Sequence, residues 1–132
     1  MIIVPPEEQI GIAGKAGSRF TGDVHSYLTC SADGTTINTV SFTPGSRTHW
    51  HSHEKGQILH VLAGRGLIQT EGEDVEVLRA GWTVWIPAGE RHWHGAAPAS
   101  FMTHTAISLG VTSWDVPVAD ADYRTPTRES RS

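Results

Sequence analysis

Histidines at strand spacing are the residues of this chain most able to do chemistry. His51 and His53 are separated by one residue, Gln57 follows four positions after His53, and His92 and His94 repeat the alternation further along the chain. In a β-strand, residues i and i+2 point to the same face, so two such histidines could share one ion. An isolated pair of this kind more often lies on the solvated face of an edge strand, so the flanking sequence has to decide.

Two glycine-bounded blocks surround these histidines. The first is PGSRTHWHSHEKGQILHVLAG and the second is AGWTVWIPAGERHWHG. Within each block, glycines and prolines stand at fixed distances from residues that can bind a metal. In order, these positions are Gly45, His51, His53, Gln57 and Gly64 in the first block, and Gly81, Pro87, Gly89 and His92 in the second.

On these two blocks the chain resembles the cupins, whose motifs have the order Gly, His, His, Glu or Gln and Gly, then Gly, Pro, Gly and His. It departs from the commonest pattern at Gln57, where Glu is usual, and at Ala96, where Asn is frequent. A narrower resemblance, to the small manganese cupins that include bacterial hydroxynitrile lyases, accommodates both departures. It is carried by WHSH, GQ, GERHWHGAAP, the MTH of residues 102–104, Phe20-Thr21-Gly22 and Trp114, across roughly residues 18–116.

The resemblance implies an all-β fold: a single-domain cupin with a jelly-roll β-barrel over residues 1–132. Its barrel core would cover about residues 18–116, and residues 117–132 would form a polar C-terminal tail. The family pattern implies that His51, His53, Gln57 and His92 bind manganese and that His94 and His104 are catalytic. It also implies a homo-oligomer, either a dimer or a tetramer.

The donor set by itself leaves several metals open. Imidazole nitrogens with an amide oxygen and no thiolate suit Mn²⁺, Fe²⁺, Ni²⁺ or Zn²⁺. Because Gln57 replaces a carboxylate, all four donors are neutral and a bound ion keeps its full double positive charge. Such an ion is a stronger Lewis acid, which favours chemistry on an alkoxide, enolate or cyanide. The missing carboxylate also makes dioxygen chemistry of the two-histidine-one-carboxylate type less favoured.

His94 and His104 are candidates for proton transfer. His94 shares a strand face with His92, and His104 shares a face of the following strand with Met102, Ala106 and Ser108. A tight connection over residues 95–100 would make these strands antiparallel neighbours, so that both histidines could face the metal. An imidazole near a dication stays neutral and can take up and return a proton. The alternative is that each histidine only hydrogen-bonds a buried carbonyl.

These features predict a metal-dependent lyase that cleaves or forms small cyanohydrins such as (R)-mandelonitrile. Two alternatives stay open, because one fold hosts many chemistries. The first is a cupin dioxygenase or an isomerase acting on a small enolic or keto substrate. The second is a non-enzymatic cupin that binds a small ligand.

The elements that must position these residues are predicted to be strands throughout. Glycine and proline recur, and apolar residues alternate with period 2, so helix signals are nearly absent. Many short strands with turn residues between them indicate a sandwich or jelly-roll barrel. The predicted strands cover residues 24–30, 36–43, 47–53, 57–63, 66–71, 74–79, 82–86, 91–95 and 101–109.

Alternation also assigns other side chains. In the strand from Gln57 both faces are largely apolar, so we expect the face with Ile58, His60 and Leu62 to pack against another subunit. Parity places Asn38, Val40 and Ser108 in the pocket wall. Four tryptophans are predicted to pack in the core or in a subunit interface: Trp50, Trp82, Trp85 and Trp93. His49 is expected at the surface or at the pocket rim, and His25 is expected to have no role in the site. In the C-terminal tail, which is predicted to be extended, only Tyr123 is expected to be an anchor.

Composition bounds the remaining possibilities. With 132 residues the chain can bury a core as one domain, and its one cysteine, Cys30, fits a reducing cytoplasm. A formal net charge of −4 without a basic run argues against nucleic acid as a partner. No apolar stretch approaches the roughly 20 residues of a membrane span. The opening Met-Ile-Ile-Val-Pro-Pro lacks the features of a signal peptide and is predicted to be a short strand.

Overall fold

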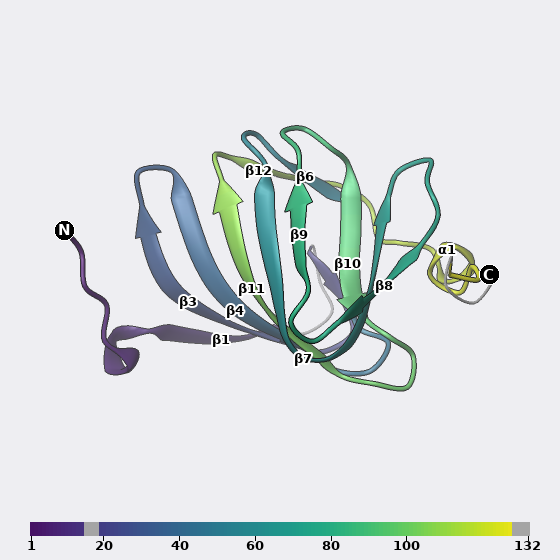
Figure 1. Cartoon of the computed structure of the whole chain (residues 1–132), viewed down its shortest axis with the longest axis horizontal. Helices are drawn as coiled ribbons and strands as arrows, with labels where there is room; N and C mark the ends of the chain where they lie inside the picture. The colour runs from purple at the N-terminus through teal and green to yellow at the C-terminus, as the bar shows by residue number, and fades with distance from the viewer. Residues whose placement is uncertain (15–18, 128–132) are drawn as a thin grey trace.

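The computed structural model describes residues 1–14 and 19–127, and within them a curled β-sheet dominates (Figure 1). Every strand pairing is antiparallel. The elements are a 3₁₀ helix η1 (Pro6–Glu8), strands β1 (Ile10–Gly14), β2 (Phe20–Thr21), β3 (Val24–Ala32), β4 (Thr35–Phe42), β5 (Arg47–Thr48), β6 (His51–His53), β7 (Gln57–Thr70), β8 (Glu76–Arg79), β9 (Thr83–Ile86), β10 (His92–Ala96), β11 (Met102–Leu109) and β12 (Thr112–Trp114), and the helix α1 (Asp120–Tyr123).

The sheet folds over on itself to form two facing layers. In one layer the order is β1-β3-β4-β11-β7, with β9 on the other side of the first half of β7. In the other layer the second half of β7 pairs with β8 and β10, and β10 continues to β5 and β6. Figure 1 shows β3, β4, β11 and β7 side by side, curving round towards β10 and β8. The all-β jelly-roll architecture is therefore confirmed.

Strand β7 belongs to both layers and turns the corner between them. Residues 57–63 and 66–71 were predicted as separate strands, but the chain stays extended from Gln57 to Thr70. Gly64 makes this possible: its φ of 80° favours glycine, and a Cβ there would collide with the Phe101 carbonyl. At Gly66 a Cβ would lie 2.7 Å from Met102 Sδ, so the two layers meet closely at this corner.

Alternation decides what each strand buries. Gln57, Leu59 and Val61 point inward, while His60 and Leu62 are exposed on the other face of β7, as predicted. Along β11, Met102, His104, Ala106 and Ser108 are buried in strict alternation. Two apolar clusters result: one fills the barrel interior around Phe42, Leu59 and Met102, and the other lies outside the second layer around Trp50, Trp93, Val118 and Tyr123.

The chain ends differ from the sequence prediction. Residues 1–5 are not a strand; the short helix η1 follows them and the first strand begins at Ile10. The tail is not merely extended, because α1 forms at 120–123 and Val118 is buried as fully as Tyr123. Tyr123 donates a hydrogen bond to the Ala96 carbonyl at 2.6 Å, and Arg47 pairs with Asp120 at 2.7 Å. The strands β1, β2 and β12 were missed; β2 and β12 have only two and three residues, too few to show a period.

None of the helices in the described part of the chain is long and apolar enough to cross a membrane.

Candidate metal centre

Three imidazoles converge inside the barrel, from two strands. His51 and His53 come from β6 and His92 from β10, where His92 is the direct cross-strand partner of His51. One ligand nitrogen from each ring lies within 4.8 Å of the others, and all three side chains are buried. Because His51 and His53 are two residues apart on one strand, their rings share the inward face. This group could hold one metal ion.

The outer ring nitrogens of these histidines have partners that orient the rings. Nδ1 of His51 donates to the His49 carbonyl at 2.8 Å, and Nδ1 of His92 donates to the Glu90 carbonyl at 2.9 Å. Nδ1 of His53 lies 3.0 Å from Thr112 Oγ1. A carbonyl only accepts, so Nδ1 carries the proton in His51 and Nε2 keeps a free lone pair. Histidines that bind metals are held in this way by their second nitrogen.

Gln57, the first residue of β7, brings an amide to the same place. Its Nε2 donates to Ser108 Oγ at 3.0 Å, which aims Oε1 at Nε2 of His92, 3.1 Å away. Ser108 is the cross-strand partner of Gln57, so the sheet register supplies this contact. The amide oxygen thus faces a nitrogen of the three-histidine group. Gln57 Oε1 is therefore placed to be a fourth donor.

Burial keeps the histidines neutral. Loss of solvation, with repulsion from His92 next, lowers the pKa of His53 to about 4 and holds the pKa of His51 well below its usual range. Loss of solvation also lowers the pKa of His92, against a hydrogen bond to Glu90 that raises it. Only a deprotonated nitrogen can bind a metal, so the site is prepared for one at neutral pH.

His94 and His104 form a second imidazole pair beside the first group. His94 Nδ1 and His104 Nε2 lie 3.1 Å apart, and both rings are buried. Their strands were expected to be antiparallel neighbours, but β10 and β11 lie in different layers, separated in the sheet by β7. The two rings meet across the barrel interior. Desolvation, then repulsion by His104, keeps the pKa of His94 well below its usual range, and desolvation lowers that of His104 to about 4.

A cavity of about 520 Å³ opens onto both imidazole groups. Asn38, Val40 and Ser108, the residues that parity placed in the wall, line it. Further wall residues come mainly from β2, β3, β4 and β12 and are mostly apolar. They include Phe20, Val24, Leu28, Phe42 and Trp114, with Arg19 beside Trp114.

Trp114 is a site residue to which sequence reasoning assigned no role. Its ring stacks on the His51 imidazole with centroids 4.7 Å apart and planes 29° apart, on β12, which pairs directly with β6. Thr112, the partner of His53, comes from the same strand. Only the match at Trp114 to the lyase-like cupins could have drawn attention to this strand before the structure.

The other histidines and tryptophans have separate places. His49 is buried, so the expected surface or rim position is wrong; it contributes its carbonyl to His51. His60 and His25 are exposed and lie away from the cavity. Trp50 and Trp93 are buried in the outer cluster, whereas Trp82 and Trp85 are 49% and 60% exposed.

The residues present fit a divalent ion. Nε2 of His53 is buried and has no hydrogen-bond partner among the described residues, a costly state for a polar atom that binding a cation relieves. The set of three imidazoles and one amide is free of thiolates and carboxylates, which suits a first-row divalent metal.

Comparisons with known proteins also indicate a cupin. The sequence model of the cupin domain called Cupin_2 matches residues 38–104. The chain is 48% identical to an (R)-mandelonitrile lyase of Granulicella tundricola over 89 residues, which is 64% of this chain and 68% of that protein.

Solved structures give the same family. A cupin-like protein from Thermotoga maritima is 39% identical and superposes with a TM-score of 0.81 over 86% of this chain and 92% of its own. A predicted oxalate decarboxylase from the same organism superposes with a TM-score of 0.71 at 19% identity, over 83% of this chain and all of that one, which is a likeness of fold. From its two motifs, its curled barrel and these matches, the chain belongs to the Cupin_2 family of cupin-domain proteins.

Proposed function

We propose that this cupin is a metal-dependent carbon-carbon lyase that cleaves or forms small cyanohydrins of the mandelonitrile type. One observation carries the proposal: two buried imidazoles in mutual contact, His94 and His104, lie beside three buried imidazoles that could hold a metal ion. The 48% identity to a protein named as an (R)-mandelonitrile lyase supports the same reaction. The mostly apolar cavity would accept the phenyl ring of such a substrate.

In this proposal His51, His53, Gln57 and His92 hold the ion, with manganese as the first choice and Fe²⁺, Ni²⁺ or Zn²⁺ as alternatives. The bound ion supplies a Lewis acid that stabilises negative charge on oxygen. Gln57 matters most for the character of the site, because an amide leaves the ionic charge undiminished. Ser108 keeps the amide oxygen turned inward by accepting from its nitrogen.

The histidine pair carries the proton. His94 is the member in ring contact with His51 and His92, at centroid distances of 5.2 and 5.6 Å. Its Nε2 has no partner in the described part of the chain, so it can accept the proton of the substrate hydroxyl. The C–C bond then breaks, its electron pair leaves with cyanide, and the former hydroxyl carbon becomes an aldehyde. His104, 3.1 Å away, shares the proton until it is returned to cyanide.

The test is release of benzaldehyde from mandelonitrile by protein dialysed against chelator and reloaded with each metal. We expect activity with manganese restored and a large loss in His94→Ala and His104→Ala. His25→Ala is the matched control, since His25 is exposed and lies away from the cavity. A metal-loaded protein with no activity would reject the lyase, and full activity in His104→Ala would reject the role of the histidine pair.

An isomerase acting on a small keto compound is the second candidate. The same histidine pair could move a proton between carbon and oxygen, and a neutral donor set would stabilise an enolate equally well. Proton exchange at carbon, followed by NMR in deuterated water with a panel of keto acids, separates this function from the lyase.

We further propose that the whole chain acts as one cupin domain and assembles with copies of itself. Leu62 on β7 and Trp85 on β9 are 49% and 60% exposed, and Trp82, just before β9, is 49% exposed. Ile58, Ile107 and Trp85 share one cross-strand row on this outer face. An apolar face of this kind favours packing against a second subunit. A reducing compartment such as the cytoplasm suits the single free cysteine.

A further inference from the structure

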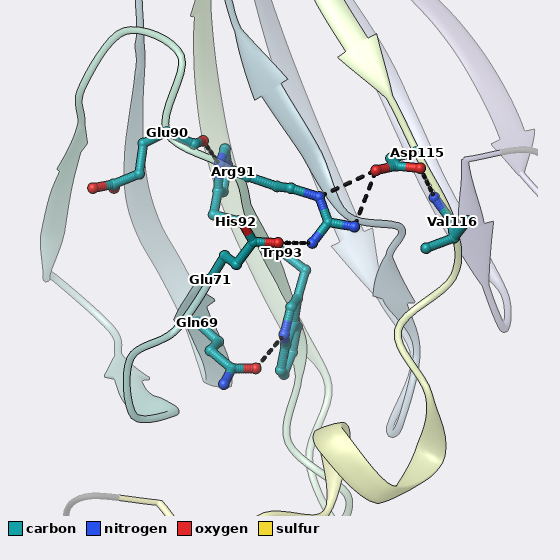
Figure 2. A network of polar contacts seen from close by, with 8 residues as sticks. All are labelled: Gln69, Glu71, Glu90, Arg91, His92, Trp93, Asp115 and Val116. Carbon is teal, nitrogen blue, oxygen red and sulfur yellow. Dashed lines mark hydrogen bonds and ion pairs between the residues drawn. The ribbon is translucent and has the colours of Figure 1, made fainter.

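The outer face of the metal centre carries a second cluster, built from the sequence neighbours of the inner residues. Trp50 precedes His51, Arg91 precedes His92, and Asp115 follows Trp114. Because side chains alternate along a strand, the neighbours of inward residues point outward and meet on the opposite side. Figure 2 shows Arg91 reaching across to Asp115 and to Glu71, at the end of β7.

Arg91 contacts three segments at once. Its Nε and Nη2 both donate to Asp115 Oδ2, at 3.1 and 3.0 Å, and Nη1 pairs with the Glu71 carboxylate. The guanidinium also lies 4.6 Å from the centre of the Trp50 ring. The hydrogen bonds from Arg91 hold the pKa of Asp115 below its usual range. A planar guanidinium can make this combination of fork and stacking contacts, and a lysine cannot.

Backbone hydrogen bonds connect the same segments. Trp50 N donates to the Val116 carbonyl at 3.0 Å, Asp115 N donates to the Trp50 carbonyl at 2.9 Å, and Glu71 N donates to the Arg91 carbonyl at 2.9 Å. On the inner side, Trp114 stacks on His51. Trp50 and Arg91 are thus followed directly by the candidate ligands His51 and His92, and Asp115 directly follows Trp114, which contacts His51.

We infer that Arg91 is a positioning residue that sets the separation of the His51 and His92 nitrogens, and with it the affinity for the metal. The inference rests on the proposed metal site. An exposed ion pair alone would contribute little. The Arg91 side chain, however, is only 30% exposed, pairs with two carboxylates and covers the buried indole of Trp50. Replacing Arg91 would therefore remove the side-chain contacts that connect the ends of β6, β10 and β12. Partners outside the ligand shell commonly change metal affinity about 10- to 100-fold.

The experiment compares the metal affinities of Arg91→Met, Arg91→Lys and Asp115→Asn by calorimetry with Mn²⁺ on the chelator-treated full chain. Asp120→Asn is the matched control, because Asp120 is an exposed carboxylate that forms an ion pair with a different buried arginine, Arg47. We expect about tenfold weaker binding in Arg91→Met, a smaller loss in Arg91→Lys and Asp115→Asn, and no change in Asp120→Asn.

A second measurement needs no metal. Nitrogen-15 NMR of the metal-free protein should show His51 as the Nδ1–H tautomer in the wild type and in Asp120→Asn, and as a tautomer mixture in Arg91→Met. Unchanged tautomers with Mn²⁺ affinity within twofold of wild type would overturn the inference, even if the melting temperature falls. A wild type that binds metal but releases no benzaldehyde would reject the lyase and leave the role of Arg91 intact.

Discussion

His94 Nδ1 and His104 Nε2 lie 3.1 Å apart although their strands belong to different layers of the barrel. The Phe42 ring contacts both imidazoles, with centroids 5.9 Å from His94 and 5.3 Å from His104. The pair therefore packs against an apolar side chain. Its two outer nitrogens, His94 Nε2 and His104 Nδ1, are buried and have no hydrogen-bond partner among the described residues. This arrangement suits proton transfer more than a structural contact, because each outer nitrogen is a buried polar atom with no such partner.

Removing one member of the pair should impair catalysis without removing the metal. In His104→Gln we expect kcat to fall about 100-fold or more, because the proton on His94 is no longer shared with a second base. Mn²⁺ content should stay at the wild-type level, since His104 is outside the donor set. Steady-state assay and elemental analysis of the same preparations check this. Loss of metal in His104→Gln would show that the residue acts on the ligand group instead.

Changing Gln57 to Glu should strengthen metal binding and weaken the reaction. A carboxylate adds negative charge to the donor set, so the ion binds more tightly but is a poorer Lewis acid. We expect a lower Kd for Mn²⁺ together with a lower kcat for cyanohydrin cleavage. Gln69→Glu is the control, because Gln69 lies on the same strand and accepts a hydrogen bond from Trp93 Nε1 outside the cavity. A Gln57→Glu protein with unchanged kcat would contradict the role of the neutral donor.

Stability of the metal-free protein should depend on pH below 6.5. The pKa values of His53 and His104 are lowered by burial from 6.5 to about 4, so between these limits the unfolded chain binds more protons than the folded chain. The free energy of unfolding is then highest above pH 6.5 and falls as the pH drops towards 4, by about 1.4 kcal/mol per pH unit for each histidine.

Urea unfolding in the presence of chelator at several pH values measures this slope. A free energy of unfolding that stays flat between pH 6.5 and 4.5 would mean that the histidines are not held neutral in the fold. Saturating Mn²⁺ should raise the free energy at pH 7 and lose that effect in acid, because protons compete for the same nitrogens.

Placing a charge on the outer face should dissociate the proposed oligomer. Trp85 is 60% exposed and shares its row with Ile58 and Ile107, so Trp85→Lys would put an ammonium in the centre of an apolar contact. Light scattering after size exclusion should give an oligomer for the wild type and the chain mass for the variant. Lys55→Glu, at the turn before β7, is the surface control. A wild-type protein that already runs as a monomer would reject this interface.

Much of the site follows from the sequence because β-strand alternation is local. Two residues separated by one position share a face wherever the strand lies, so His51 with His53, and Gln57 with Leu59, had to point the same way. The recurrence of glycine, proline and histidine at fixed intervals identified the two motifs, and these determined the family, the fold class and the candidate donors. None of this required knowing which strands are neighbours.

Which residues meet across the barrel was decided by the tertiary structure. β10 and β11 follow one another in sequence but lie in different layers, so the contact of His94 with His104 depends on the corner that β7 makes at Gly64. Trp114 reaches His51 because a three-residue strand pairs with β6, and Arg91 reaches Trp50 and Asp115 across three segments. Such contacts join positions far apart in the chain, and local periodicity carries no information about them. They form only when closing the sheet brings the inward faces of these strands together.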